Sequence, residues 1–273
     1  MSADRFTASG VFRVGDVLGR AWRIFTGNIL FFLGAPVLVY AAIVAIFAAS
    51  ASLVGMAGAD QRVAWASFGM GGIVGLALYT IGQAVILIGA FQQLCGEPLR
   101  VGPALRRSLA RALPLVVLAV LWSLVVGICL IVAFVVVPLS VFQAGIGMLL
   151  AYALVPIALV PSALAFVVWV VAVPACVIEG LGPIASMFRS FDLSKGYRWK
   201  IFGITLLAGL LYLAGSLIDL IVTPISAVLG TVVHLAWDAV VMAAWNCTVI
   251  MIYHDLRVAK EGIDAGQIAS IFD

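Results

Sequence analysis

Three ionisable side chains in the last quarter of the sequence lie within apolar surroundings: Asp219, His234 and Asp238. His234 and Asp238 are four residues apart, a spacing that places both side chains on one face of a helix. An ionisable group at membrane depth is costly and is a functional hypothesis by default. This cluster therefore suits a proton relay or a cation site, and a His/Asp pair at this spacing can also hold a metal ion.

Two other interpretations of this cluster remain open. The side chains can pair with one another and join two neighbouring helices, or they can lie shallow enough to contact water and headgroups. Asp219 lies about 27 Å along a helix from the basic start of its apolar run, which places it near the far interface. Because Asp238 lies a turn deeper, we expect an oxygen of Asp219 or Asp238 within hydrogen-bonding distance of His234 or of a polar group on another helix. We expect no resident metal ion or cofactor.

The elements that carry these residues are predicted to be membrane-spanning helices. The chain of 273 residues is 65% hydrophobic and 10% charged, whereas soluble domains carry about 25% charged residues. A membrane-spanning helix needs about 20 apolar residues, and the chain has runs of at least that length at Ile29–Ala49, Phe68–Phe91, Pro114–Val177, Ile201–Val222 and Val232–Tyr253. The fold class is therefore predicted to be all-α, in a single integral membrane domain formed by residues 1–273.

The distribution of basic residues predicts the number of spans. Every Lys and Arg except Arg62 falls into one of four clusters along the chain. Positive charge accumulates in cytoplasmic loops, so an even number of spans lies between consecutive clusters. The long run Pro114–Val177 then holds two spans with a turn near Pro138–Ala151, where Pro138, Pro156 and Pro161 act as helix breakers. This predicts a polytopic protein with six transmembrane helices, arranged as three hairpins, and with both termini in the cytoplasm.

Three of the basic clusters lie on short amphipathic segments that each precede a pair of spans. Arg or Lys on one face and Leu, Phe or Trp on the other is typical of a helix that lies in the membrane interface. We expect Asp16 to cap the first of these helices, and Pro103 and Pro183 to occupy first turns of the others. Independent juxtamembrane helices are one interpretation. The other is a threefold repeat of a cytoplasmic interfacial helix plus a hairpin, at residues 11–98, 99–178 and 179–260.

The basic segments predict contacts with membrane lipids that are anionic at the cytoplasmic face. Each Lys or Arg near such a surface contributes about 1 kcal/mol. The candidate contacts are Arg20, Arg23, Arg106, Arg107, Arg111, Arg189, Lys195, Arg198 and Lys200. The alternative is that these charges only orient the spans. No nucleic-acid partner is expected, and the sequence names no protein partner.

Three stretches carry a family resemblance. The first is Val14-Gly15-Asp16-Val17-Leu18. The second holds Val173-Pro174, Val177-Ile178-Glu179-Gly180, Arg189-Ser190, Leu193, Lys195-Gly196 and Arg198-Trp199. The third is the tail from Tyr253 through Asp255-Leu256-Arg257 and Lys260-Glu261-Gly262 to Asp273. Together they resemble the bacterial proteins described as the glycerophosphoryl diester phosphodiesterase membrane domain. The resemblance implies a stand-alone membrane domain in a bacterial cytoplasmic (inner) membrane. The catalytic barrel of some members is not recognisable in this sequence, so the resemblance implies no enzymatic activity.

Three classes of function follow from these features. The favoured class is a non-catalytic membrane protein that interacts with lipid or with partner proteins. A transporter or channel for a small solute, ion or lipid is the alternative, because transporters use interrupted helices and intramembrane polar residues; here these are Gln83, Asp219, Asp238 and the region Pro138–Pro161. An enzyme is not expected, because the sequence contains no recognised catalytic motif. A polar cavity between the hairpins would favour transport, and a closed apolar bundle with a basic collar would favour the first class.

Overall fold

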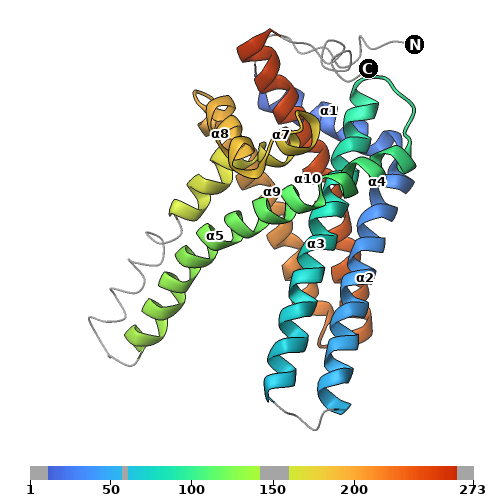
Figure 1. The fold of residues 1–273 in the computed structure, drawn as a ribbon, viewed down its shortest axis with the longest axis vertical. Helices are drawn as coiled ribbons and strands as arrows, with labels where there is room; N and C mark the ends of the chain where they lie inside the picture. The colour runs from blue at the N-terminus through green and yellow to red at the C-terminus, as the bar shows by residue number, and fades with distance from the viewer. Residues whose placement is uncertain (1–11, 57–60, 142–159, 263–273) are drawn as a thin grey trace.

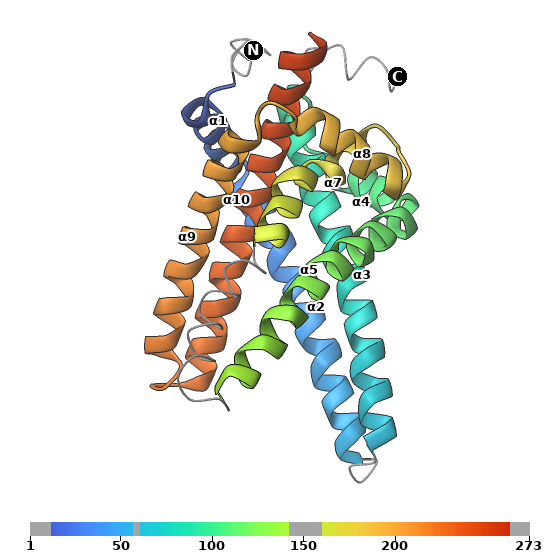
Figure 2. The same ribbon diagram turned by 90° about the vertical axis from the view of Figure 1, so that its left-hand side faces the viewer.

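The computed structural model describes residues 12–56, 61–141 and 160–262, and the regular elements in these ranges are all α-helices. The long helices α2 (Ile29–Met56), α3 (Gln61–Leu94), α9 (Arg198–Val222) and α10 (Ala227–Glu261) run side by side (Figures 1 and 2). Three short helices gather at the end of the molecule where α10 ends: α1 (Val14–Gly27), α4 (Val101–Ala110) and α8 (Pro183–Ser194). We refer to these three helices as the collar, and to that end as the collar end.

Five helical stretches are long and apolar enough to cross a membrane: Ile29–Gly55, Trp65–Leu94, Val160–Ile178, Arg198–Val222 and Val228–Glu261. A sixth arises if α4 and the first part of α5 (Ala112–Val141), which meet at a bend of 64°, are counted as one span. The all-helical class and the presence of several span-length helices are therefore as the sequence predicts. The arrangement as six spans in three hairpins stays a prediction.

Two local predictions were wrong. Pro138 does not break a helix, because α5 continues through it and ends at Val141; the rest of the predicted turn, with Pro156, lies outside the described residues. Proline is tolerated within membrane helices because an apolar surrounding strongly favours keeping the backbone hydrogen-bonded, and α2 likewise contains Pro36. Asp16 lies in the first turn of α1, whose N-cap is Arg13. Pro183, by contrast, begins α8 as expected.

Glycines allow α2 and α3 to pack closely. Gly71 faces Ser50, and a Cβ atom at Gly75 would lie 3.6 Å from the ring of Phe47. Further along α3, Gly82 lies directly against Val39, with no room for a Cβ atom. Small residues at four-residue spacing let helix backbones approach in membranes, and Gly71 and Gly75 have this spacing.

The last two long helices form an antiparallel pair joined by a short turn, as the sequence predicts. Helix α9 ends at Val222, and the side chain of Ser226 caps α10 by accepting a hydrogen bond from the Leu229 backbone N–H at 3.3 Å. The indole of Trp237 lies directly over Gly215. Helix α10 also packs on α1, α2 and α3, so it is the central helix of the described bundle.

The fit between Gly82 and Val39 is testable. A methyl group at position 82 must displace a stiff β-branched side chain, so Gly82→Ala should lower the free energy of unfolding by about 1–3 kcal/mol. Gly72→Ala is the matched control, because no atom lies within 4 Å of a Cβ at that position of the same helix. Thermal melting in detergent compares the two variants. Equal melting temperatures would contradict close packing of α2 against α3.

Candidate functional site

Two collar helices, α1 and α8, are held to the bundle by charged groups at the end of α10. Asp255 and Arg20 are both buried and form an ion pair that joins α10 to α1. His254 Nδ1 lies 3.2 Å from the other carboxylate oxygen of Asp255, and Arg20 Nε also donates to the Asp16 carbonyl at 3.2 Å. A buried carboxylate costs several kcal/mol when it lacks such partners, so these contacts fix the position of α1.

A closed ring of five side chains joins α8 and the segment after α7 (Ala172–Ile178) to the same end of α10. Arg189 bridges two carboxylates, with Nε 2.9 Å from Glu179 and Nη2 2.6 Å from Glu261. Arg257 Nε lies 2.9 Å from Glu261, and its Nη1 donates to the Tyr253 hydroxyl at 3.3 Å. That hydroxyl donates to Glu179 at 2.7 Å, which closes the ring.

The ring is electrically balanced, because it contains two carboxylates and two guanidinium groups. Burial opposes the charge on Arg189, but its hydrogen bonds to Glu179 and the charges of Glu179 and Glu261 raise the pKa of Arg189 above its ordinary value. Hydrogen bonds to ionised groups are about twice as strong as neutral ones. The ring therefore holds the collar end together through charge-assisted contacts.

Two collar helices turn small residues inward and large apolar residues outward. The buried face of α8 carries Ser186, Ser190 and Ser194 beside Leu193, and that of α4 carries Ala104 and Ser108. Their exposed faces carry Ile184, Phe188 and Phe191 on α8, and Leu105 and Leu109 on α4. The buried serines are satisfied by backbone carbonyls, as with Ser190 Oγ and the Val168 oxygen at 2.7 Å. This is the reverse of a soluble surface, where large apolar side chains turn inward.

The predicted lipid contacts differ in their exposure. Arg23, Arg106, Arg107 and Lys195 are exposed. Lys200 is exposed too, and it contacts other groups of the chain, as do Arg20, Arg111, Arg189 and Arg198. Arg20 departs most from the prediction, because it is buried and faces Asp255 rather than a lipid headgroup.

Three of the partnered cations contact the backbone or an aromatic ring. Arg111 donates to the Gly180 carbonyl at 2.6 Å, and Lys200 donates to the Phe12 carbonyl at 2.8 Å. Arg198 packs over the ring of Phe191 at 4.5 Å from the ring centroid. The Nε and Nη2 atoms of Arg198 are buried without a hydrogen-bond partner in the described part of the chain.

The predicted intramembrane cluster is only partly visible. His234 Nε2 lies 3.4 Å from Asp238 Oδ2 across one turn of α10, so the expected proximity of these two side chains is present. Asp219 lies in the last turns of α9, and its side chain lies outside the described residues. Asp238 is also within electrostatic range of the Tyr40 and Tyr79 hydroxyl groups. A group of three or more His, Cys, Asp or Glu able to hold a metal ion does not occur among the described residues.

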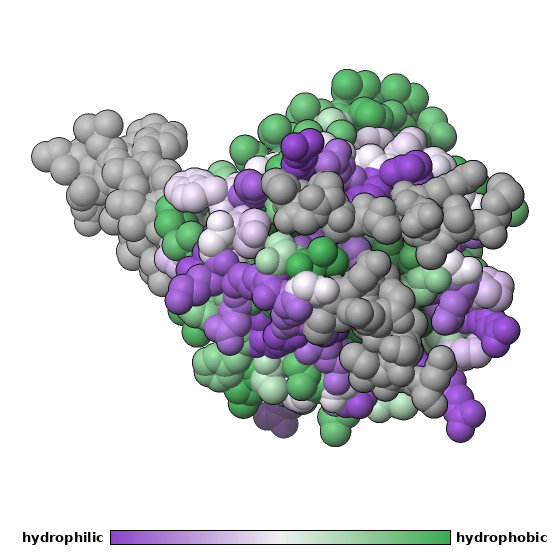
Figure 3. Space-filling view, turned by 90° about the horizontal axis from the view of Figure 1, so that it is seen from above, coloured by the Kyte–Doolittle hydropathy of each residue, from purple (hydrophilic) through white to green (hydrophobic). Residues whose placement is uncertain are grey.

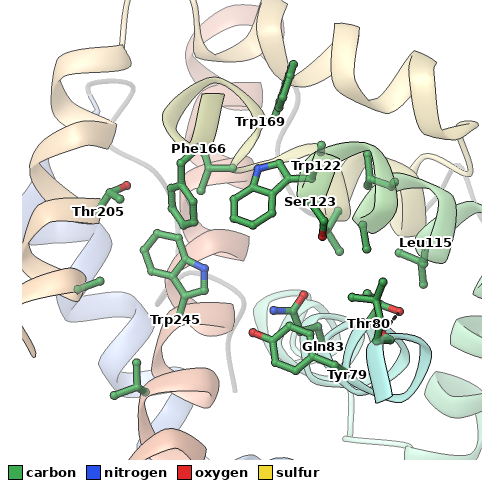
Figure 4. Close-up of a pocket in the computed structure, with 18 of the residues that line it drawn as sticks. Tyr79, Thr80, Gln83, Leu115, Trp122, Ser123, Phe166, Trp169, Thr205 and Trp245 are labelled. Atoms are coloured by element: carbon green, nitrogen blue, oxygen red, sulfur yellow. Dashed lines mark hydrogen bonds between the residues drawn. The ribbon is translucent and has the colours of Figure 1, made fainter. Parts of the chain in front are cut away.

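A cavity of about 520 Å³ lies between α3, α5, α9, α10 and the segment Val160–Ile178 (Figure 4). Aromatic side chains form one wall: the ring of Phe166 lies 5.5 Å from that of Trp122 and 5.6 Å from that of Trp245. Across the cavity are neutral polar groups, among them Tyr79 with the Gln83 side chain hydrogen-bonded to it. The described lining residues include neither His234 nor Asp238.

Sequence reasoning missed both the ring and the cavity wall. Glu179, Tyr253 and Glu261 were noted only because they carry a family resemblance, although Glu179 follows the longest apolar run of the chain and an acid there needs a partner. For Trp122, Phe166 and Trp245 the sequence offers no such signal. Aromatic residues are ordinary in apolar runs, and only the fold shows that these three meet.

The fold and the site together define an all-helical protein with five to six helices long and apolar enough to cross a membrane, and with a charged network at one end. Comparison with protein-family models, with curated proteins and with solved structures yields no match. The resemblance to the glycerophosphoryl diester phosphodiesterase membrane domain therefore stays a prediction, and the function has to be argued from the geometry.

The buried pair of Arg20 and Asp255 gives a direct test of how the collar is held. Arg20→Met leaves a buried carboxylate without its main partner and should cost about 3–5 kcal/mol of stability. Combining it with Asp255→Leu removes both charges and should restore most of that loss. Arg23→Met is the control, since Arg23 is exposed one turn further along α1. A double variant as unstable as Arg20→Met alone would show that the charges themselves do not hold α1.

The contact between His234 and Asp238 is also expected to be structural. Asp238→Asn should lower stability by about 1 kcal/mol, because the His234 side chain is 44% exposed and the interaction is partly screened. A double-mutant cycle with His234→Asn, followed by thermal melting, measures the coupling. Strictly additive effects would mean that the two side chains do not interact.

Proposed function

We propose that this chain is a non-catalytic, multi-pass membrane protein that binds anionic lipid headgroups through its collar. The observation that carries the proposal is the exposed face of α4 and α8. There, large apolar side chains that prefer hydrocarbon lie beside exposed Arg106, Arg107 and Lys195. Helices with this combination lie in the membrane interface, with the apolar face among the acyl chains and the cations at the headgroups.

The distribution of polar residues over the whole molecule supports the same proposal. Hydrophilic residues gather on the collar end, and hydrophobic residues surround them at the rim (Figure 3). The one basic residue outside the clusters, Arg62, lies in the first turn of α3, at the end far from the collar. With the collar at the cytoplasmic face of a bacterial inner membrane, both termini lie on that side.

Transport of a small solute, ion or lipid is the second candidate, and the cavity is the observation in its favour. A role in transport for the charged residues His234 and Asp238 has less support, because they pair with each other and are not among the described lining residues of the cavity. Transport through this cavity would therefore rely on neutral groups such as Gln83. Uptake or flux assays in proteoliposomes separate the two candidates, since headgroup binding alone predicts no flux.

Removing collar charges should weaken the retention of anionic lipid. Arg106→Gln combined with Arg107→Gln should reduce the binding of phosphatidylglycerol by about 1 kcal/mol for each charge removed, and high salt should diminish the difference. Native mass spectrometry after detergent extraction, with phosphatidylethanolamine as the zwitterionic reference, measures the retained lipid. Arg62→Gln is the matched control at the opposite end. If the double variant and this control retain equal amounts of phosphatidylglycerol, the collar charges do not bind lipid and serve only to orient the spans.

A further inference from the structure

The cavity has the size and lining of a site for a largely apolar molecule. Its volume of about 520 Å³ falls within the range of roughly 300–1,000 Å³ typical of ligand sites. The continuous wall formed by Trp122, Phe166 and Trp245 offers broad apolar contact from three separate segments of the chain. These rings form a surface that fits an extended hydrocarbon chain.

The polar groups of the cavity favour a neutral acceptor rather than a charge. The described lining residues include no Asp, Glu, Lys or Arg, so a charged ligand would be left uncompensated. Thr80 is engaged by its own helix, since its hydroxyl donates to the Leu76 and Ala77 carbonyls at 3.0 Å. The hydroxyl oxygen of Thr205, by contrast, is buried and has no hydrogen-bond partner within the described ranges. An ester carbonyl oxygen is an acceptor that would satisfy it.

The face of α9 that lines the cavity leads to an arginine at the collar end. Thr205 follows Arg198 by seven residues, which is about 10 Å and two helical turns, so both residues lie on one face of α9. The Nε and Nη2 atoms of Arg198 have no hydrogen-bond partner among the described groups. A phospholipid joins each acyl chain through an ester to an anionic phosphate. The order acyl chain, ester and phosphate in the lipid matches the order cavity, Thr205 and Arg198 along α9.

The cavity is open over part of its boundary. Helix α5 packs on α3, α4, α7 and α8, and away from the collar it splays out from the long helices (Figure 1). The cavity lies in the angle between these helices and is only partly enclosed. A ligand that already resides in the hydrocarbon layer therefore has the shortest path into it.

We propose that the cavity binds one acyl chain of a phospholipid from the surrounding bilayer, with the ester carbonyl at Thr205 and the phosphate towards Arg198. The aromatic wall holds the chain, and the headgroup stays at the interface. The position of the headgroup rests on the proposed function of the collar, whereas the binding of the chain does not.

Photo-crosslinking in lipid nanodiscs tests the proposal. The probe is phosphatidylglycerol with a diazirine group near the end of one acyl chain, and peptide mapping locates the label. We expect labels concentrated on Trp122, Phe166 and Trp245. Gly209→Phe should reduce them about tenfold, which corresponds to roughly 1.4 kcal/mol of binding free energy. Gly209 lines the cavity, and no atom lies within 4 Å of a Cβ there, so the new ring fills the cavity without displacing the fold.

Gly203→Phe is the matched control. Gly203 lies on the same helix, is equally unobstructed, and is not a lining residue, so this variant should leave the cavity labels unchanged. Equal labelling in the two variants overturns the proposal, as do labels spread evenly over exposed residues such as Leu210 and Leu211. Labelling by a free diazirine fatty acid but not by the phospholipid probe would also overturn it. Thermal melting of both variants checks that they remain folded.

The same assay separates this proposal from the collar proposal. Arg106→Gln with Arg107→Gln removes positive charge from the exposed face of α4 and should leave the cavity labels in place. The double variant can keep both its cavity labels and its phosphatidylglycerol retention. That result would contradict the proposed function of the collar but would still support this inference. Thr205→Val preserves the shape of the side chain but removes the hydroxyl, so it should weaken cavity labelling. If Thr205→Val is labelled as strongly as the unchanged protein, the proposed contact between Thr205 and the ester carbonyl is wrong.

Discussion

Compensation of the buried charge of Asp255 is the interaction on which the arrangement of the collar depends. The carboxylate lies near the end of the central helix α10, and Arg20 brings the opposite charge from α1. At the same end, the ring of Glu179, Arg189, Tyr253, Arg257 and Glu261 fastens α8 and the segment after α7 to α10. Segments from the beginning, the middle and the end of the described chain therefore meet through charge pairs.

In a molecule this apolar, charge pairs help to determine which helices contact one another. Lipid tails are as apolar as leucine side chains, so apolar contact alone gives a membrane helix little preference for one partner over another. Specific contacts then come from polar pairs and from close geometric fit. The charged network fills the first role at the collar end, and the contacts of Gly82 with Val39 and of Gly215 with Trp237 fill the second along the long helices.

The sequence predicted the helical class and the span-length helices, because both depend on local composition and period. It also placed His234 beside Asp238, since their spacing within one helix fixes that contact. The partner of Arg20 was not predictable, because an exposed and a buried arginine look alike in an amphipathic pattern. The cavity escaped prediction for a related reason, since Trp122, Phe166 and Trp245 belong to three different segments and meet only in the folded molecule.

The ion pair of Arg20 and Asp255 also implies an order of assembly. Its two residues are 235 positions apart in the chain, and synthesis proceeds from the N-terminus. The ribosome has therefore released α1 long before it makes Asp255. In that interval Arg20 has not yet met Asp255, its partner in the ion pair. The pair can form only once α10 has been made, so a chain that stops before α10 lacks the helix that α1 contacts most.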